Sequence, residues 1–194
     1  MLPAGGISFA AKEGQLPLGG KVMAEKTTLR LAGVIKESIV DGPGLRFTVF
    51  VQGCPHHCPG CHNPQTHDFS GGFDCDVEKL VAEVQKNPLL QGVTFSGGEP
   101  FCQCEALYRL ATKIKSLGLD LYIYSGYTYE QILQLEDPFA RKLLEQCDVL
   151  MDGPFLLELR TLDAPFRGSK NQRAIDVAAT LAGEEIILHD FGAQ

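Results

Sequence analysis

Two patterns of hydrophobic residues alternate along this chain, one typical of strands and one typical of helices. Short apolar runs, which are typical of buried strands, lie at residues 45–51, 92–95, 121–124 and 149–151. The stretches between them carry apolar residues at helical spacing, as in Val77, Leu80, Val81 and Val84. Further helical patterns lie at residues 107–117, 132–135 and 139–144, followed by an extended segment at residues 173–177 and an apolar segment at residues 186–188.

This order of strands and helices predicts a sheet of parallel strands joined by right-handed helical crossovers. Four or five such units are too few for a closed eight-stranded barrel, so we expect an α/β fold of the open partial (β/α) barrel type. In such a sheet the loops that follow the strands meet at one edge and build the site. We expect residues 29–194 to form this one domain, because 194 residues with 44% hydrophobic content fill a single substantial core.

The first 28 residues have no sustained period and contain five glycines and two prolines, which predicts a flexible amino-terminal extension. Met23 within it is a candidate physiological start. The net charge of −7 gives no footprint for nucleic acid or an anionic membrane. Neither a membrane span nor a secretory leader is apparent. We therefore expect a cytoplasmic protein whose seven cysteines stay reduced.

Three of these cysteines, Cys54, Cys58 and Cys61, lie in one loop after the first apolar strand, with three and two residues between them. Iron–sulfur clusters and structural zinc sites normally take four ligands, so three cysteines leave one coordination position open. A disulfide is not expected in a reducing compartment. A zinc site completed by His56, His57 or His62 is the alternative, although His56 and His57 are expected to be exposed loop residues rather than ligands.

Three further loops with unusual residues follow the next three strands. They are Ser96-Gly97-Gly98-Glu99-Pro100, Ser125-Gly126-Tyr127 and Asp152-Gly153. Alone, the two glycines make a turn and Glu99 caps the next helix. Paired glycines also let the main chain approach a ligand closely. At the same edge as an open metal position, these loops predict a cofactor site.

Together the motifs resemble, in the same order, those of the glycyl-radical-enzyme activating proteins, which belong to the radical S-adenosylmethionine superfamily. The resemblance extends over residues 29–177. It rests on the segments at residues 40–46, 50–54, 58–63, 96–100, 124–128, 152–155 and 167–173. The last two segments are most similar to those of the activators of anaerobic ribonucleoside-triphosphate reductase.

The resemblance implies a radical mechanism and a set of site residues. It implies that Cys54, Cys58 and Cys61 hold three irons of a catalytic [4Fe–4S] cluster, and that the fourth iron binds S-adenosylmethionine. Reductive cleavage gives methionine and a 5′-deoxyadenosyl radical, which takes a hydrogen from a glycine of the reductase's glycyl radical subunit. The implied cofactor contacts are Gly97, Gly98 and Glu99 near the methionine ammonium, Gly60, Cys61, His62 and Asn63 beside the adenine, and Ser125 and Asp152 near hydroxyl or methionine groups. A low-potential electron donor such as flavodoxin or ferredoxin is the second expected partner.

Several alternatives stay open at this point. Three interpretations of the basic residues Arg167, Lys170 and Arg173 remain: they are solvated, they dock the reductase, or they close over the site. The remaining cysteines are expected to be buried small side chains rather than ligands of a second cluster; they are Cys75, Cys102, Cys104 and Cys147. The alternative functions are activation of another glycyl radical enzyme of the formate-lyase type, radical chemistry on a free metabolite, and a non-catalytic zinc or electron-transfer module.

Overall fold

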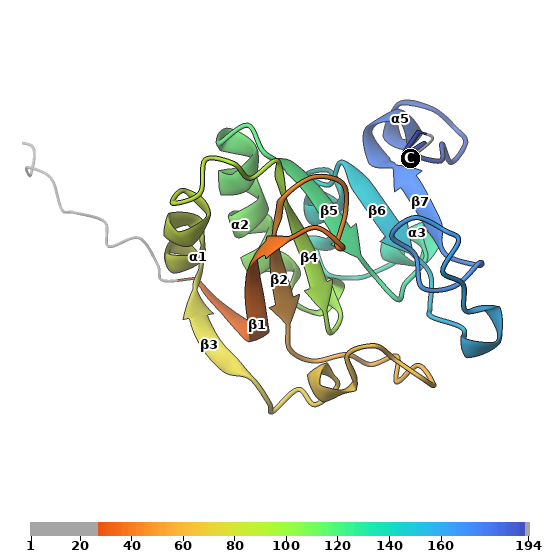
Figure 1. The fold of residues 1–194 in the computed structure, drawn as a ribbon, viewed down its shortest axis with the longest axis horizontal. Helices are drawn as coiled ribbons and strands as arrows, with labels where there is room; N and C mark the ends of the chain where they lie inside the picture. The colour runs from red at the N-terminus through yellow and green to blue at the C-terminus, as the bar shows by residue number, and fades with distance from the viewer. Residues whose placement is uncertain (1–26, 193–194) are drawn as a thin grey trace, which may run out of the picture.

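The computed structural model describes residues 27–192, which form one seven-stranded mixed sheet with helices against it (Figure 1). Met23 and nearly all of the expected extension lie outside the described residues. The first strand already begins at Thr28, where it pairs with Asp76. No helix in the described part is long and apolar enough to cross a membrane.

The sheet has the strand order β3-β1-β2-β4-β5-β6-β7. Its strands are β1 (Thr28–Ser38), β2 (Arg46–Val51), β3 (Phe73–Asp76), β4 (Gly92–Gly97), β5 (Asp120–Tyr124), β6 (Val149–Asp152) and β7 (Arg173–Asp176). The α-helices are α1 (Val77–Val84), α2 (Cys104–Ser116), α3 (Tyr129–Ile132), α4 (Ala140–Leu144) and α5 (Val177–Ala182). Short 3-10 turns are η1 (Pro64–Thr66), η2 (Pro100–Cys102) and η3 (Leu157–Leu159).

The centre of the sheet is parallel and its two flanks are antiparallel. Strands β2, β4, β5 and β6 pair in parallel, as predicted. The prediction of an all-parallel sheet is wrong for β1, β3 and β7, which pair antiparallel to β2, β1 and β6. The β1–β2 connection is too short for a crossover, and the β6–β7 connection lacks the α-helix that usually forms one. The result is a mixed sheet whose outer strands are β3 and β7.

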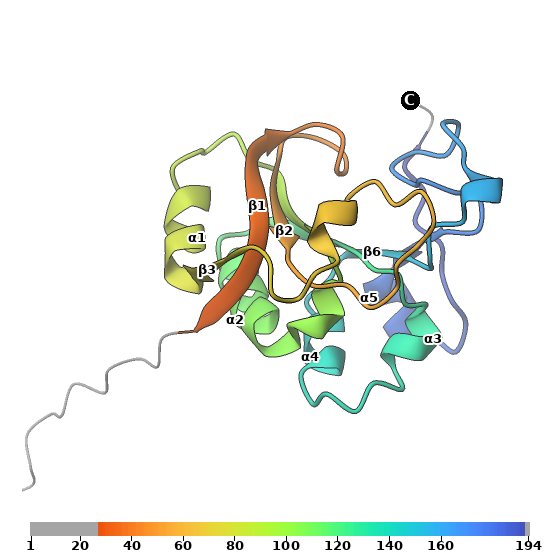
Figure 2. The same ribbon diagram turned by 90° about the horizontal axis from the view of Figure 1, so that it is seen from below.

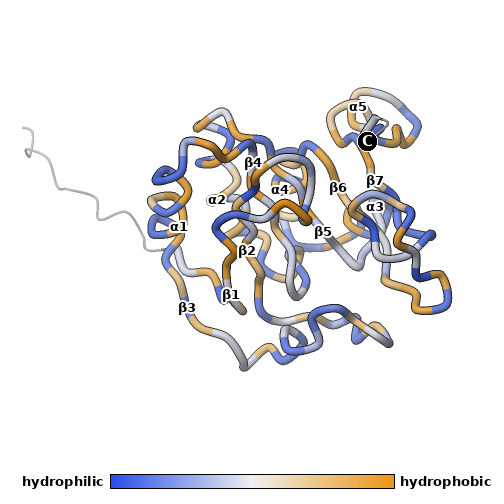
Figure 3. Tube along the Cα trace, viewed as in Figure 1, coloured by the Kyte–Doolittle hydropathy of each residue, from blue (hydrophilic) through white to orange (hydrophobic). Residues whose placement is uncertain are grey.

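One face of the sheet and the facing helices form the main hydrophobic core. Phe47, Val93 and Ile123 point from the strands into this core, where α2 contributes Leu107 and Ile114. Figure 2 shows α2 and α4 on the same side of the sheet. The hydropathy colouring in Figure 3 is orange along β2 and β6 and alternates with blue along α1. This pattern is expected of buried strands covered by amphipathic helices.

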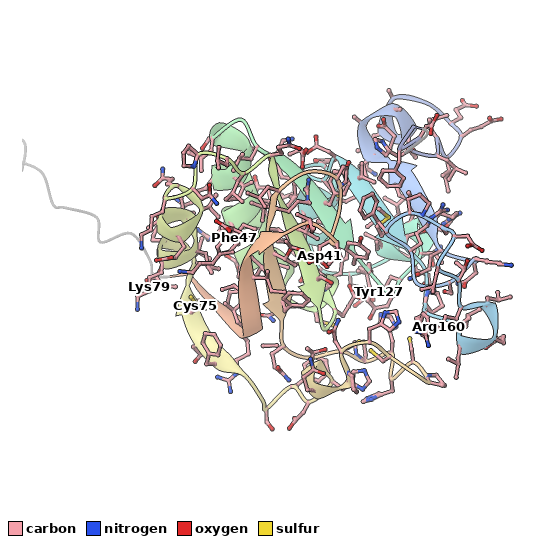
Figure 4. All side chains as sticks on the ribbon, viewed as in Figure 1. Asp41, Phe47, Cys75, Lys79, Tyr127 and Arg160 are labelled. Carbon is pink, nitrogen blue, oxygen red and sulfur yellow. The ribbon has the colours of Figure 1, made fainter. Side chains whose placement is uncertain are left out.

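The opposite face of the sheet carries a buried polar network around Arg46. Its side chain is fully buried, donates from Nε to Oγ1 of Thr94 at 2.7 Å, and lies 2.5 Å from Oδ1 of Asp120. The guanidinium also lies 4.1 Å from the ring centroid of Tyr122. Asp41, labelled in Figure 4, accepts through its main-chain oxygen from Oγ1 of Thr94 at 2.8 Å. The network therefore fastens the β1–β2 connection over this face.

We expect Arg46→Ala to lower the free energy of unfolding by about 3 kcal/mol, because it leaves buried acceptors without their cationic donor. The measurement is urea unfolding followed by circular dichroism. Arg109→Ala is the matched control, since Arg109 forms an exposed i,i+4 ion pair with Glu105 and should cost about 0.5 kcal/mol or less. Equal effects of the two substitutions would contradict a structural role for the Arg46 network.

Candidate cluster and cofactor site

The loops with unusual residues gather at one edge of the sheet because they follow four parallel strands. In Figure 1 the arrowheads of β2 and β4 point to the same lower edge, where the cysteine loop crosses. Main-chain hydrogen bonds join the loops. The nitrogen of Glu99 donates to the oxygen of Gly53 at 2.8 Å, and that of Ser125 donates to the oxygen of Met151 at 2.9 Å. The strand ends therefore form one connected rim.

A cavity of about 790 Å³ lies at this rim. That volume is in the range of small-molecule and cofactor sites. Eight of the predicted site residues line it: Cys54, Cys58, Cys61, His62, Asn63, Gly97, Gly98 and Ser125. The other predicted residues, Gly60, Glu99 and Asp152, are described by the structure but do not belong to this lining.

The three cysteines of the loop carry free thiols. Cys54 is buried, whereas Cys58 and Cys61 are half-buried. Burial raises the pKa of the Cys54 thiol, and hydrogen bonds from the backbone of His56 and His57 act in the opposite direction. The backbone N–H of Asn63 donates to Sγ of Cys61 at 3.3 Å. Such N–H donation to sulfur is one of the means by which proteins adjust an iron–sulfur cluster.

The donor set of three thiols in one loop has the chemistry of an iron–sulfur cluster site with one open position. A zinc ion bound by thiolates at about 2.3 Å requires its ligands to converge on one point. Within residues 27–192, no three His, Cys, Asp or Glu side chains are arranged to hold one ion, the three cysteines included. His67 also lines the cavity, and its Nε2 is buried without a hydrogen-bond partner. An orphaned buried polar atom of this kind indicates a missing polar group, such as a cluster sulfide.

Gly97 and Gly98 allow the β4 loop to approach β2 closely. Gly97 has φ +96°, which favours glycine, and a Cβ added there would lie 2.7 Å from Cα of Phe50. A Cβ added at Gly98 would lie 2.3 Å from the main-chain oxygen of Gly53. Because both obstacles are backbone atoms, neither position accepts a side chain without a shift of the rim.

Glu99 lies beneath the rim and is fully buried. Its Oε1 accepts from the nitrogen of Phe101 at 3.0 Å and from Oγ of Ser125 at 2.9 Å. Its Oε2 accepts from the nitrogen of Gly126 at 2.8 Å and lies 2.8 Å from Nε2 of His56. The bond from Phe101 caps η2, as the turn-and-cap interpretation of this motif predicts. The carboxylate therefore joins the loops of β2, β4 and β5.

Asp152 is held by contacts within the protein. Its buried carboxylate accepts from the nitrogen of Tyr129 at 2.7 Å and from Nε of Arg173 at 2.9 Å. Arg173 also pairs with Glu130 at 2.8 Å, and this bond lowers the pKa of Glu130 to about 2. Arg173 is therefore an ion-paired residue and not a solvated charge.

The connection between β6 and β7 forms one wall of the cavity. The rings of His62 and Phe155 lie 4.9 Å apart between centroids, and Arg167 lines the cavity with its Nε buried and unpartnered. Lys170 is exposed. Of the interpretations left open for this basic segment, the described geometry favours closure over the site for Arg167, whereas the exposed Lys170 fits both solvation and docking.

The remaining cysteines lie in three kinds of environment. Cys104 and Cys147 are buried, as predicted, and burial raises the pKa of the Cys147 thiol well above its usual value. Cys75 is half-buried and Cys102 is exposed, so the prediction of burial is wrong for Cys102. Cys102 lies at the end of η2, where a turn leaves its side chain at the surface.

The chain matches known proteins over most of its length. A family model described as a 4Fe-4S single cluster domain matches residues 40–175. The anaerobic ribonucleoside-triphosphate reductase-activating protein of Vibrio cholerae is 34% identical over 142 residues, which cover 69% of this chain and 89% of that protein. The protein of the same description in Enterobacteria phage T4 is 35% identical over 140 residues, covering 69% and 85%. This chain belongs to the family of anaerobic ribonucleoside-triphosphate reductase-activating proteins.

The reductase-activating family was also indicated by the motifs, and this prediction is confirmed. The matched residues of the 4Fe-4S model include all three cysteines of the loop and both paired-glycine positions. A solved structure of QueE from Escherichia coli aligns with a TM-score of 0.41 and 18% identity, over 52% of this chain and 54% of that one.

The sequence did not single out two residues at this edge of the sheet, His67 of the cavity lining and Tyr127 beside it. His67 follows η1 in the long connection after the cysteines, where no periodic pattern marks it. Tyr127 was noted only as part of a loop, and Figure 4 shows it at the lower edge of the sheet. Its ring packs edge-on against His56, with centroids 4.5 Å apart. The contact between Tyr127 and His56 has no local sequence signal, because the two residues belong to separate loops.

Proposed function

We propose that this chain activates an anaerobic ribonucleoside-triphosphate reductase by radical S-adenosylmethionine chemistry. Membership of the activating family supports the reductase as partner. The observation that carries the chemistry is the cavity at the sheet edge, where three free thiols lie beside the paired glycines of the β4 loop. An open partial barrel, with the cavity at the carboxyl ends of its strands, is the fold that this function would use.

In this proposal Cys54, Cys58 and Cys61 hold the [4Fe–4S] cluster and leave one iron for S-adenosylmethionine. When bound, the cluster would supply the chemistry of reductive S-adenosylmethionine cleavage, which in this proposal serves to remove a hydrogen atom from a glycine of the reductase. A low-potential donor of the flavodoxin or ferredoxin type supplies the electron.

The protein's own residues bind, orient and shield the cofactor. Gly97 and Gly98 line the cavity and bring main-chain groups to the methionine end of the cofactor, since without side chains the β4 loop can pack directly against the backbone of β2 at this rim. His62 and Asn63 border the adenine from the cysteine loop, with Gly60 behind them at φ +73°. Ser125 lies on the cavity wall, within reach of a bound cofactor.

Glu99 and Asp152 do not line the cavity, and we assign them a supporting role behind its walls. Glu99 joins three of the loops that form the rim, and Asp152 is bound by Arg173 and by the start of α3. Both were expected to contact the cofactor directly. In this proposal they hold the cavity walls in place, because their oxygens already accept hydrogen bonds from the protein.

The test is anaerobic reconstitution of the full chain with iron and sulfide, followed by a reductant and S-adenosylmethionine. We expect 5′-deoxyadenosine and methionine in equal amounts, and a glycyl radical signal in electron paramagnetic resonance when the anaerobic reductase is added. A fully loaded protein that forms no 5′-deoxyadenosine would contradict the radical mechanism. Formation of 5′-deoxyadenosine without a radical on the reductase would contradict the assigned partner.

A further inference from the structure

His56, inside the cysteine loop, is fastened to a different loop of the rim. Its Nε2 lies 2.8 Å from Oε2 of the buried Glu99, and only 17% of its side chain is exposed. Its ring packs edge-on against Tyr127, with the centroids 4.5 Å apart. The expectation that His56 is an exposed loop residue is therefore wrong, whereas the neighbouring His57 is exposed as predicted.

The surrounding loops are shaped to admit this ring. A Cβ added at Gly126 would lie 2.4 Å from Cδ2 of His56, so the glycine leaves the space that the imidazole occupies. The nitrogen of Gly126 donates to the same Glu99 oxygen that meets His56. Because Oε1 of Glu99 is bound by Phe101 and Ser125, the carboxylate is held in one orientation. A carboxylate oxygen only accepts, so Nε2 of His56 is the donor.

The anchored ring belongs to the short segment between two of the three cysteines. His56 lies two positions after Cys54 and two positions before Cys58. The next residue, His57, has φ +47°, a left-handed conformation that residues other than glycine seldom adopt. A side-chain anchor at His56 thus holds the short segment that joins Cys54 to Cys58.

We propose that His56 is a positioning residue, which by binding Glu99 holds the cysteine loop in the shape that presents its thiols to the cluster. Glu99 accordingly acts on the cluster through His56. The inference rests on the proposed function only in assigning the cluster to the three cysteines. Groups that orient metal ligands from behind typically change metal affinity by about 10- to 100-fold when they are removed.

The experiment compares His56→Ala, His56→Gln and His57→Asn in the full chain after anaerobic reconstitution. It measures iron and sulfide content, the rate of iron loss to a chelator, and the resonance spectrum of the reduced cluster. His56→Ala should lose iron about 10-fold faster or more and broaden the spectrum. His56→Gln should stay close to the parent, because its terminal N–H reaches about as far as Nε2. His57→Asn is the control, since it removes the adjacent imidazole and Asn tolerates positive φ.

The outcomes separate this inference from the proposed function. A parent protein that takes up no cluster would overturn the proposed function and the role of His56 with it. A loaded parent together with equal iron retention in His56→Ala would overturn only the role of His56, as would a His56→Gln protein as defective as His56→Ala. If His56→Ala does not fold, His56→Asn replaces it, because the shorter side chain cannot reach Glu99. Faster iron loss from His56→Asn than from His56→Gln then supports the inference, and equal rates overturn it.

Discussion

Replacing Cys58 by serine is expected to reduce the iron content of the reconstituted protein from about four per chain to near zero. A thiolate is the ligand that iron–sulfur clusters require, and a serine hydroxyl remains protonated at neutral pH. The loop then has only two thiols, which are too few to hold the cluster. The formation of 5′-deoxyadenosine should fall below detection in the same protein.

Cys102→Ser is the matched control for Cys58→Ser. Cys102 is exposed at the end of η2 and lines a different surface pocket, so its replacement should leave the iron content unchanged. Iron and acid-labile sulfide are measured in both variants, together with the visible absorption of the cluster. Full iron content in Cys58→Ser, or loss of iron in Cys102→Ser, would show that a different set of cysteines binds the cluster.

The second large effect is expected for Gly98→Ala, which should weaken S-adenosylmethionine binding at least about 10-fold and lower the free energy of unfolding by about 2 kcal/mol. The added Cβ would lie 2.3 Å from the oxygen of Gly53 and 3.0 Å from that of Val51. Those two oxygens accept the hydrogen bonds of Glu99 and of Gly98 itself. The methyl group therefore pushes the β4 loop away from the strand that leads to the cysteines.

Gly33→Ala is the control for Gly98→Ala, because a Cβ at Gly33 meets no atom within 4 Å and its φ is not in the left-handed region. It should change the free energy of unfolding by about 0.5 kcal/mol or less. Binding is measured by equilibrium dialysis of radiolabelled S-adenosylmethionine against the cluster-loaded protein, and stability by urea unfolding. If Gly98→Ala binds S-adenosylmethionine as tightly as the parent protein does, the β4 glycines do not belong to the cofactor site.

The parts of the fold that the sequence predicts well are those with local causes. Asp76 accepts from the nitrogen of Glu78 at the start of α1, and Gly118, at φ +77°, follows the end of α2, as their positions in the sequence indicate. The four parallel strands were also predicted from their apolar runs. Strands β1 and β3 were not, since β3 has only four residues, of which two are Asp, and β1 has irregular register against β2.

The same distinction between local and long-range causes applies to the residues of the site. The motifs predict which loops carry chemistry, and parallel strands bring those loops to one edge whatever their order. The sequence could not predict which side chains face the cavity and which bind one another. Glu99 meets His56, which lies 43 positions earlier, and Asp152 meets Arg173, which lies 21 positions later. Such partners are fixed only by the assembled sheet, so they have no spacing rule in the chain.

The connection that leads to β7 lies late in the chain, and this affects the order in which the parts of the site form during synthesis. Phe155 and Arg167 close the cavity from the connection that leads to β7, whereas the cysteines belong to the loop after β2. During synthesis the cysteine loop leaves the ribosome long before that wall exists. The nascent chain therefore exposes its thiols to the surrounding solution until the last third has folded, which leaves an interval in which a cluster carrier can reach them and oxygen can damage them.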